Sequence, residues 1–82
     1  MRIVWDERKR IANIAKHGMD FADLTPEFFE SAVTGPTRLG RSIAIGWHVG
    51  IGTVVIHARY GREAISIISM RPANSRERAV LW

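Results

Sequence analysis

Three β-rich runs stand close together in Ser42–Met70, SIAIGWHVGIGTVVIHARYGREAISIISM. The pattern predicts strands over Ser42–Trp47, Thr53–Arg59 and Glu63–Met70, with glycine-containing turns between them. Links this short join antiparallel neighbours, because parallel strands need a long crossover connection. This stretch therefore predicts an antiparallel sheet.

Toward the N-terminus, the sequence predicts one further strand and a helix. Arg2–Trp5 is a short β-branched and aromatic run that is typical of a strand. Asp6 can cap a following helix, and His17-Gly18 ends that helix with glycine at the left-handed position after it. The apolar positions that we expect to form one inward face are Ile11, Ile14 and Ala15.

Two more helical segments are predicted. The first, Asp20–Ala32, is interrupted at Thr25-Pro26 and ends before a loop that begins at Gly35-Pro36. The second is Asn74–Trp82, where Asn74 and Glu77 have the spacing of a capping box.

The predicted order is β-α-α-β-β-β-α. Strands that follow helices favour an α+β fold, with an antiparallel sheet and helices packed mainly on one face. No internal repeat or flexible linker divides the chain, so we expect a single domain over residues 1–82. The opposite sheet face should be partly open.

Charge indicates a polyanionic partner. Twelve Lys and Arg side chains stand against eight Asp and Glu, a net charge of +4, and ten of the twelve cations are arginine. Arginine binds phosphate through a planar fork of donors, so the balance favours nucleic acid. A basic surface that only keeps the protein soluble would give the same balance.

Cysteine usage and apolar patterning restrict the environment. The chain has no cysteine, which excludes disulfides and thiolate metal sites. The apolar start Ile3–Trp5 is too short for a signal peptide, and no run approaches the length of a membrane span. We therefore predict a cytoplasmic protein with no membrane contact.

Two groups of side chains could carry chemistry. If their strands are neighbours, Arg59 and Arg71 could lie together at one end of the sheet and share an anion such as phosphate; otherwise they are exposed edge arginines. His57 shares a strand face with Arg59. Lys16 and His17 could move protons, or could simply complement the negative end of a helix.

Histidine spacing and aromatic content add less. His17, His48 and His57 lack the spacing of metal ligands, so we predict no metal and no cofactor. Aromatic side chains could stack on unpaired bases or pack in the core. Those considered for stacking are Trp5, Trp47, Tyr60 and Trp82.

With these residues placed, the sequence resembles the BrnT toxins of type II toxin–antitoxin systems, within the wider RelE-like fold. The resemblance covers nearly the whole chain. It rests on Val4-Trp5-Asp6-Glu7, Lys9-Arg10, Asn13, Lys16-His17-Gly18 and Phe21, then on Ala44-Ile45-Gly46, Ile65-x-Ile67-Ile68-Ser69-x-Arg71-x-Ala73 and Glu77-Arg78.

The resemblance implies an endoribonuclease that inhibits translation and growth. It also implies a BrnA-like antitoxin with a ribbon-helix-helix domain, a 2:2 complex, and repression of the shared operon through operator DNA. The residues that match the family's motifs are Lys16, His17, Arg59 and Arg71.

We hypothesise a metal-independent reaction in which the ribose 2′-OH attacks the adjacent phosphate. Arg59 and Arg71 would stabilise the developing charge, and His17, assisted by Lys16, would transfer protons. His57 and Glu63 are further proton-transfer candidates. The alternatives are a nucleic-acid-binding module without catalysis and a scaffold that docks an acidic partner.

Overall fold

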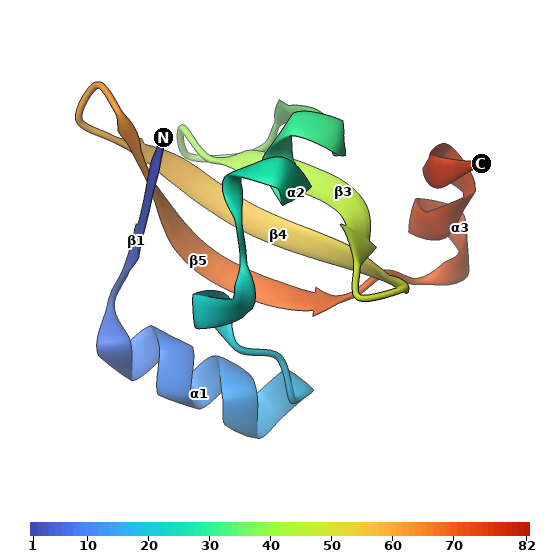
Figure 1. The fold of residues 1–82 in the computed structure, drawn as a ribbon, viewed down its shortest axis with the longest axis horizontal. Coiled ribbons are helices and arrows are strands. Elements are labelled where there is room, and N and C mark those ends of the chain that lie inside the picture. Colours follow the sequence, from blue (N-terminus) through green and yellow to red (C-terminus); the bar gives the residue numbers. More distant parts are fainter.

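The computed structural model describes all residues, Met1–Trp82, and contains one five-stranded sheet in the order β1-β5-β4-β3-β2 (Figure 1). The strands are β1 (Arg2–Trp5), β2 (Val33–Pro36), β3 (Ser42–His48), β4 (Ile51–Tyr60) and β5 (Ala64–Pro72). The helices are α1 (Glu7–His17), α2 (Pro26–Ser31) and α3 (Ser75–Arg78), with 3-10 turns η1 (Phe21–Asp23) and η2 (Ala79–Leu81).

The α+β class is confirmed, and β3, β4 and β5 form the predicted antiparallel hairpins. The expectation of a purely antiparallel sheet is wrong, because β1 pairs with β5 in parallel, with Arg2 opposite Ala64. The rule of short links applies only to consecutive strands. Here α1, α2 and three strands lie between the two partners and supply the long connection that parallel pairing needs.

The strand β2 corrects the predicted order to β-α-α-β-β-β-β-α. Val33–Pro36 pairs antiparallel with β3, where the sequence predicted a helix end and a loop. Gly35 and Pro36 are turn-forming residues that weaken a strand signal. They are tolerated because β2 is an edge strand, and an edge strand need not donate every backbone N–H to a neighbour.

Two glycines show that helices cover both faces of the sheet. A Cβ at Gly46 would meet the Phe28 ring of α2 at 3.0 Å, whereas one at Gly52 would meet Arg78 of α3 at 2.8 Å. Gly46 pairs with Thr53, the neighbour of Gly52 along β4, so the two glycines face opposite sides. The expectation of helices mainly on one face is thus wrong for the C-terminal segment, which lies on the side opposite α2.

We call the α2 side the core face and the other side the outer face. The core face carries the row Ala44, Val55 and Met70, and the outer face carries the row Ile45, Val54 and Arg71. On the core face the apolar cluster consists of Met19, Phe21, Leu24, Phe28, Ala44, Val55, Ile67 and Met70. On the outer face Trp47 and Trp82 meet edge to face with ring centroids 5.4 Å apart.

Asn13 attaches α1 to the sheet. Beyond the end of β1 the edge of β5 is open, and α1 runs along it in the same direction (Figure 1). The Asn13 carboxamide donates to the Met70 carbonyl (2.8 Å) and the Met19 carbonyl (3.0 Å) and accepts from the Met70 N–H (3.1 Å). It therefore satisfies the backbone groups that another strand would otherwise pair.

This attachment turns the apolar residues of α1 outward. Ile11 is 58% exposed and Ile14 37% exposed, so the predicted inward face is wrong. Asn13 is the buried residue of the helix. Because each helical residue advances by about 100°, Ile11 and Ala15 lie on the side of α1 roughly opposite Asn13.

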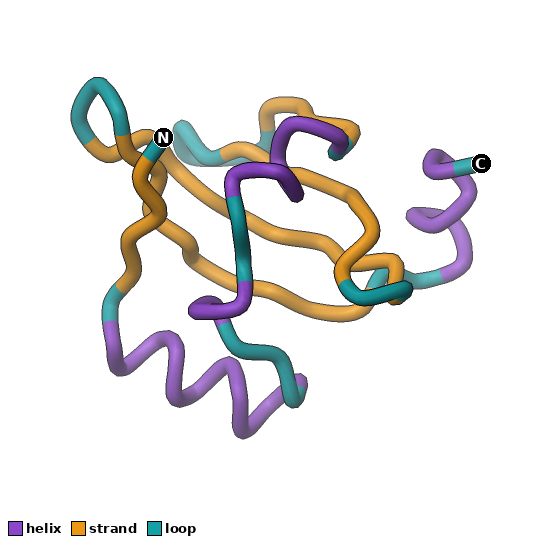
Figure 2. Tube along the Cα trace, in the orientation of Figure 1, coloured by secondary structure: helices purple, strands orange, loops and turns teal.

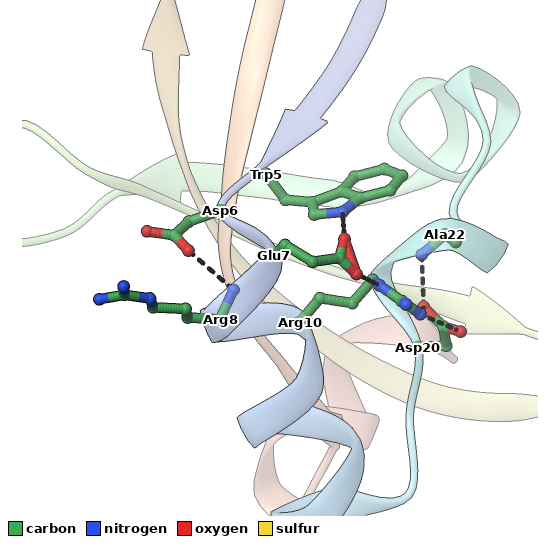
Figure 3. A network of polar contacts seen from close by, with 7 residues as sticks. All are labelled: Trp5, Asp6, Glu7, Arg8, Arg10, Asp20 and Ala22. Carbon is green, nitrogen blue, oxygen red and sulfur yellow. Dashed lines mark hydrogen bonds and ion pairs between the residues drawn. The ribbon is translucent and has the colours of Figure 1, made fainter.

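A polar network fixes the first half of α1 (Figure 3). Arg10 binds both carboxylate oxygens of Asp20, at 3.0 and 2.9 Å, and also binds Glu7, which accepts from the Trp5 indole N–H. The pKa of Asp20 is lowered, first by the Ala22 backbone N–H and then by Arg10. The network joins β1, α1 and η1, so the helix cannot rotate freely over the edge of β5.

The chain termini lie at opposite ends of the molecule (Figure 2). The N-terminal strand begins beside the β4–β5 turn, where the Arg2 N–H donates to the Glu63 carbonyl at 2.8 Å. None of the helices has the length and apolar character needed to cross a membrane.

Candidate functional site

Arg59 and Arg71 lie far apart, so the predicted convergence of the two arginines is wrong. Arg59 pairs with Ile65, whereas Arg71 pairs with Val54. Five residues of β4 separate the two rows, a distance of about 16 Å along the strand. The two side chains also project from opposite faces of the sheet. Arg71 pairs with Val54, which faces outward, whereas Arg59 lies four residues after the core residue Val55 and therefore projects from the core face.

A β-bulge explains the error in the predicted face. Ile56 pairs with Ser69 and the next residue, His57, pairs with Ile67, so Ile68 is an extra residue in β5. Strict alternation along β5 would put Ile67 and Arg71 on the same face. The extra residue reverses the alternation, and Ser69 and Arg71 face outward while Ile67 stays in the core.

Arg71 forms an ion pair within the protein, with the carboxylate of Glu77. Its Nη1 and Nη2 groups donate to the two carboxylate oxygens of Glu77 at 2.8 and 2.7 Å, a planar two-point contact. Arg71 lowers the pKa of Glu77 to about 2. Glu77 also closes the predicted capping box with Asn74, so the pair fastens α3 to β5.

Lys16 and His17 lie in an open pocket of about 260 Å³ between α1 and β5. We call it the α1–β5 pocket; its polar lining includes Lys9, Lys16, His17 and Ser69. Arg71 follows Ser69 by two residues on the same outer face, about 7 Å along the strand. The fold therefore places Lys16 and His17 in this pocket, with Arg71 outside its lining and Arg59 on the opposite face of the sheet.

Neither lysine of the α1–β5 pocket has an ion-pair partner in the structure. Asn13 fixes α1 against Met70, and Lys16 lies one turn further on, about 5 Å along the helix axis. Because α1 and β5 run in the same direction, this step carries Lys16 toward the end of β5 that holds Arg71 (Figure 1). The pocket combines an imidazole, two free ammonium groups and a hydroxyl.

Arg59 and Glu63 meet elsewhere, at the β4–β5 turn. Together with Arg62 they line an open pocket of about 400 Å³, and none of the three side chains forms an ion pair. Sequence reasoning missed Arg62 and the neighbouring Arg2. The pairing of β1 with β5, which brings Arg2 to this turn, has no local signal in the sequence.

His57 lies on the core face, across the sheet from the α1–β5 pocket. Its ring meets Phe29 edge to face with centroids 5.2 Å apart. Its Nε2 atom is buried and has no hydrogen-bond partner. Burial lowers the pKa of His57, which favours the neutral imidazole in the folded protein.

The comparison with protein families decides the assignment. A family model described as the ribonuclease toxin BrnT of type II toxin–antitoxin systems matches residues 5–77. The chain belongs to the BrnT family. The resemblance inferred from the sequence motifs is thus confirmed. No curated protein matches the chain significantly.

A solved BrnT structure has the same fold. The 1.1 Å crystal structure of the Brucella abortus ribonuclease toxin BrnT is similar to this chain with 55% sequence identity and a TM-score of 0.87. The match covers 92% of this chain and 99% of that chain. The mixed sheet described above is therefore the BrnT fold, and the chain is a ribonuclease toxin of a toxin–antitoxin system.

Within the BrnT fold, His57 should affect stability rather than proton transfer. Its pKa falls below the ordinary 6.5 on folding, so the unfolded chain binds the proton more readily. Stability should therefore decrease as the pH falls below 6.5. In the variant His57→Phe, the free energy of unfolding should fall less between pH 6.5 and lower pH than in the wild type, measured by urea unfolding at a series of pH values. The control variant His48→Gln should show the wild-type pH dependence. A His57→Phe variant with the wild-type pH dependence would contradict the assignment.

Proposed function

We propose that the chain is a metal-independent endoribonuclease whose reacting phosphate binds in the α1–β5 pocket. The observation that carries this proposal is the location of Lys16 and His17 beside Ser69, at an open site with unpaired cations. Membership of a ribonuclease family supplies the reaction class.

The proposed reaction is an in-line transesterification. A base takes the proton of the ribose 2′-OH, the 2′-oxygen forms a bond to the adjacent phosphorus, and the bond to the 5′-oxygen breaks as that oxygen is protonated. His17 transfers protons with assistance from Lys16, since imidazole exchanges protons readily near neutral pH. The ammonium groups of Lys9 and Lys16 stabilise the charge that develops on the phosphorane.

We assign no proton transfer to the other residues predicted from the sequence. Arg71 lies two residues beyond Ser69 on the outer face, outside the lining of the α1–β5 pocket, and its ion pair with Glu77 holds it in position. Arg59 and Glu63 are too distant to act on the same phosphate, and we assign them to contacts with another part of the RNA. We assign no step of the reaction to His57, which lies on the other side of the sheet.

We further propose a BrnA-like antitoxin with a ribbon-helix-helix domain as the partner. The expected complex is 2:2, with the dimer contact made by the antitoxin, and it would repress the operon through operator DNA. Membership of a type II toxin–antitoxin family supports an antitoxin. The outward apolar residues of α1, Ile11 and Ile14, offer exposed surface for a protein contact.

The chemistry of the products tests the reaction. Purified protein with a 5′-labelled single-stranded RNA in EDTA should release fragments that end in a 2′,3′-cyclic phosphate, and an all-deoxy strand of the same sequence should stay intact. A 3′-OH end, equal cleavage of the deoxy strand, or complete inhibition by EDTA would contradict the proposal.

Two other function classes predict different results. A binding module without catalysis would bind RNA but leave it intact, and variants of its cations would weaken binding on every sequence alike. A scaffold for an acidic partner would cause no growth defect when the chain is expressed alone. Induced expression beside a strain with an empty vector separates this last class from the other two.

A further inference from the structure

Arg2 and Tyr60 stand on either side of a small residue on the outer face. Arg2 of β1 and Tyr60 of β4 both pair with Ala64 of β5, so the three residues form one row across three strands. The Cα atoms of Arg2 and Tyr60 are two strand spacings apart, about 10 Å. Both side chains leave the outer face, because the next residue in β1, Ile3, packs against the core cluster.

Arg2 and Tyr60 both line two open pockets. One, of about 430 Å³, lies along the edge strand β1 and is lined by Arg2, Val4, Trp5, Asp6, Tyr60 and Ser66. The other, of about 360 Å³, lies over the β4–β5 turn and is lined by Arg2, Tyr60 and Arg62, among others. The pair therefore stands between two hollows, each open to solvent.

The chemistry of the pair fits a nucleotide. Tyr60 is 63% exposed, and no ion pair or side-chain hydrogen bond engages Arg2 or Arg62. Proteins that bind single-stranded nucleic acids combine an aromatic ring, on which a base stacks, with cations that contact the phosphates. An acidic protein would also satisfy the arginines, but RNA supplies both the phosphates for the cations and a base for the flat exposed ring, and the chain belongs to a ribonuclease family.

Arg2 and Tyr60 lie on the path of an RNA chain that extends over the outer face from the proposed site of cleavage. Ser69, which lines the α1–β5 pocket, faces outward like Ala64 and lies five residues further along β5, about 16 Å away. An RNA strand on the outer face can span this distance with a few nucleotides. The second row on this path, Val4, Ser66 and Ala58, is uncharged, and the carboxylate of Asp6, which also lines this hollow, accepts a hydrogen bond from the Arg8 backbone N–H.

We propose that Arg2 and Tyr60 form a nucleotide subsite for single-stranded RNA, separate from the residues that react. Tyr60 stacks on a base, and Arg2, with Arg62 beside it, contacts the backbone phosphates. The subsite is a positioning site for the substrate, and its place in the reaction rests on the proposed function of the α1–β5 pocket.

Binding of an RNA that cannot be cleaved tests the subsite. The probe is a short fluorescein-labelled single-stranded RNA with 2′-O-methyl groups throughout, measured by anisotropy. Tyr60→Ala should raise Kd by roughly tenfold, as expected for one lost base–aromatic stack. Tyr60→Phe should restore binding, and Trp82→Ala, which removes a 90% exposed aromatic from the other end of the molecule, should keep the wild-type Kd.

Two further variants test the phosphate contact and the path. Arg2→Ala should reduce the slope of log K against log salt by about 0.7, the value for one phosphate contact on a single strand. Arg76→Ala, an exposed cation on α3, is the matched control. Ser66→Leu, which fills the 430 Å³ hollow beside Arg2 and Tyr60, should also weaken binding.

Binding of the uncleavable RNA tests the subsite, and the products of cleavage test the reaction, so that either proposal can fail alone. If Tyr60→Ala and Ser66→Leu both bind the probe within twofold of wild type, the subsite is wrong, whatever products wild-type protein gives. If binding depends on Tyr60 but the cleaved ends are wrong, the subsite stands and the reaction fails. On cleavable RNA, Tyr60→Ala should raise KM and leave kcat unchanged, and a fall in kcat alone would overturn the positioning role.

Discussion

Replacement of His17 by alanine should lower the rate of RNA cleavage by about 10²-fold or more, the usual contribution of a side chain that transfers protons. His17 lines the α1–β5 pocket beside Lys16 and Ser69, and as a cation at the end of α1 it affects stability by much less than such a loss. The measurement is kcat on a short labelled RNA.

Variants of the arginines supply the comparison. Arg59→Ala should raise KM with little change in kcat, because Arg59 projects from the core face, opposite to Ser69, and lies three residues of β4, about 10 Å, from the row of Ser69. For Arg71, the matched pair is Glu77→Gln alone and Arg71→Gln with Glu77→Gln, since both variants lack the ion pair. A slower reaction in the double variant than in Glu77→Gln then reports the guanidinium itself. Loss of cleavage in Arg59→Ala with His17→Ala fully active would overturn the proposed location.

Asn13→Leu should strongly destabilise the fold. Leucine has a similar size but leaves the Met70 N–H, the Met70 carbonyl and the Met19 carbonyl without their partner. Buried backbone groups left unsatisfied in this way should lower the free energy of unfolding by about 3 kcal/mol. For a domain of this size, that loss lowers Tm by about 10–20 °C, which calorimetry or circular dichroism can measure.

The control for Asn13 lies two residues away. Ile11 is the more apolar side chain but is 58% exposed, so Ile11→Ala should change the free energy of unfolding by less than about 1 kcal/mol. A larger loss in Ile11→Ala than in Asn13→Leu would mean that α1 packs through its apolar positions after all.

Features encoded by neighbouring residues were predictable from the sequence. The three strands of the central stretch show their own β-branched pattern and turns, and their pairing follows from the short links. The Asp6 cap and the capping box of Asn74 and Glu77 depend on residues two or three positions apart, and both are present. Each of these features is decided within a few residues, where propensity and capping act.

Features that depend on distant segments were not predictable. The parallel partner of β1 is chosen from strands that form much later in the chain, and nothing in Arg2–Trp5 identifies it. The expected inward face of this helix was Ile11, Ile14 and Ala15, because polar residues such as Asn13 are rarely buried. Its burial follows from the open edge of β5, which has backbone groups that only a polar side chain can satisfy.

The candidate site shows how one residue can redirect a functional prediction. The alternation of side chains along β5 is reliable up to Ile67, and the extra residue Ile68 reverses it. The sequence Ile67-Ile68-Ser69 contains no glycine or proline that would reveal the bulge. Arg71 consequently faces away from the side of Arg59, and the two arginines serve different parts of the molecule.

The parallel pair of β1 and β5 also has a consequence for biosynthesis. Its partners are as far apart in the chain as Arg2 and Ala64, so the first strand leaves the ribosome long before its neighbour exists. At ordinary translation speeds that interval lasts about 3–12 s. The surface formed by both strands, which includes Arg2 beside Tyr60, is assembled only near the end of synthesis, so a nascent toxin is incomplete while the ribosome that makes it is still working.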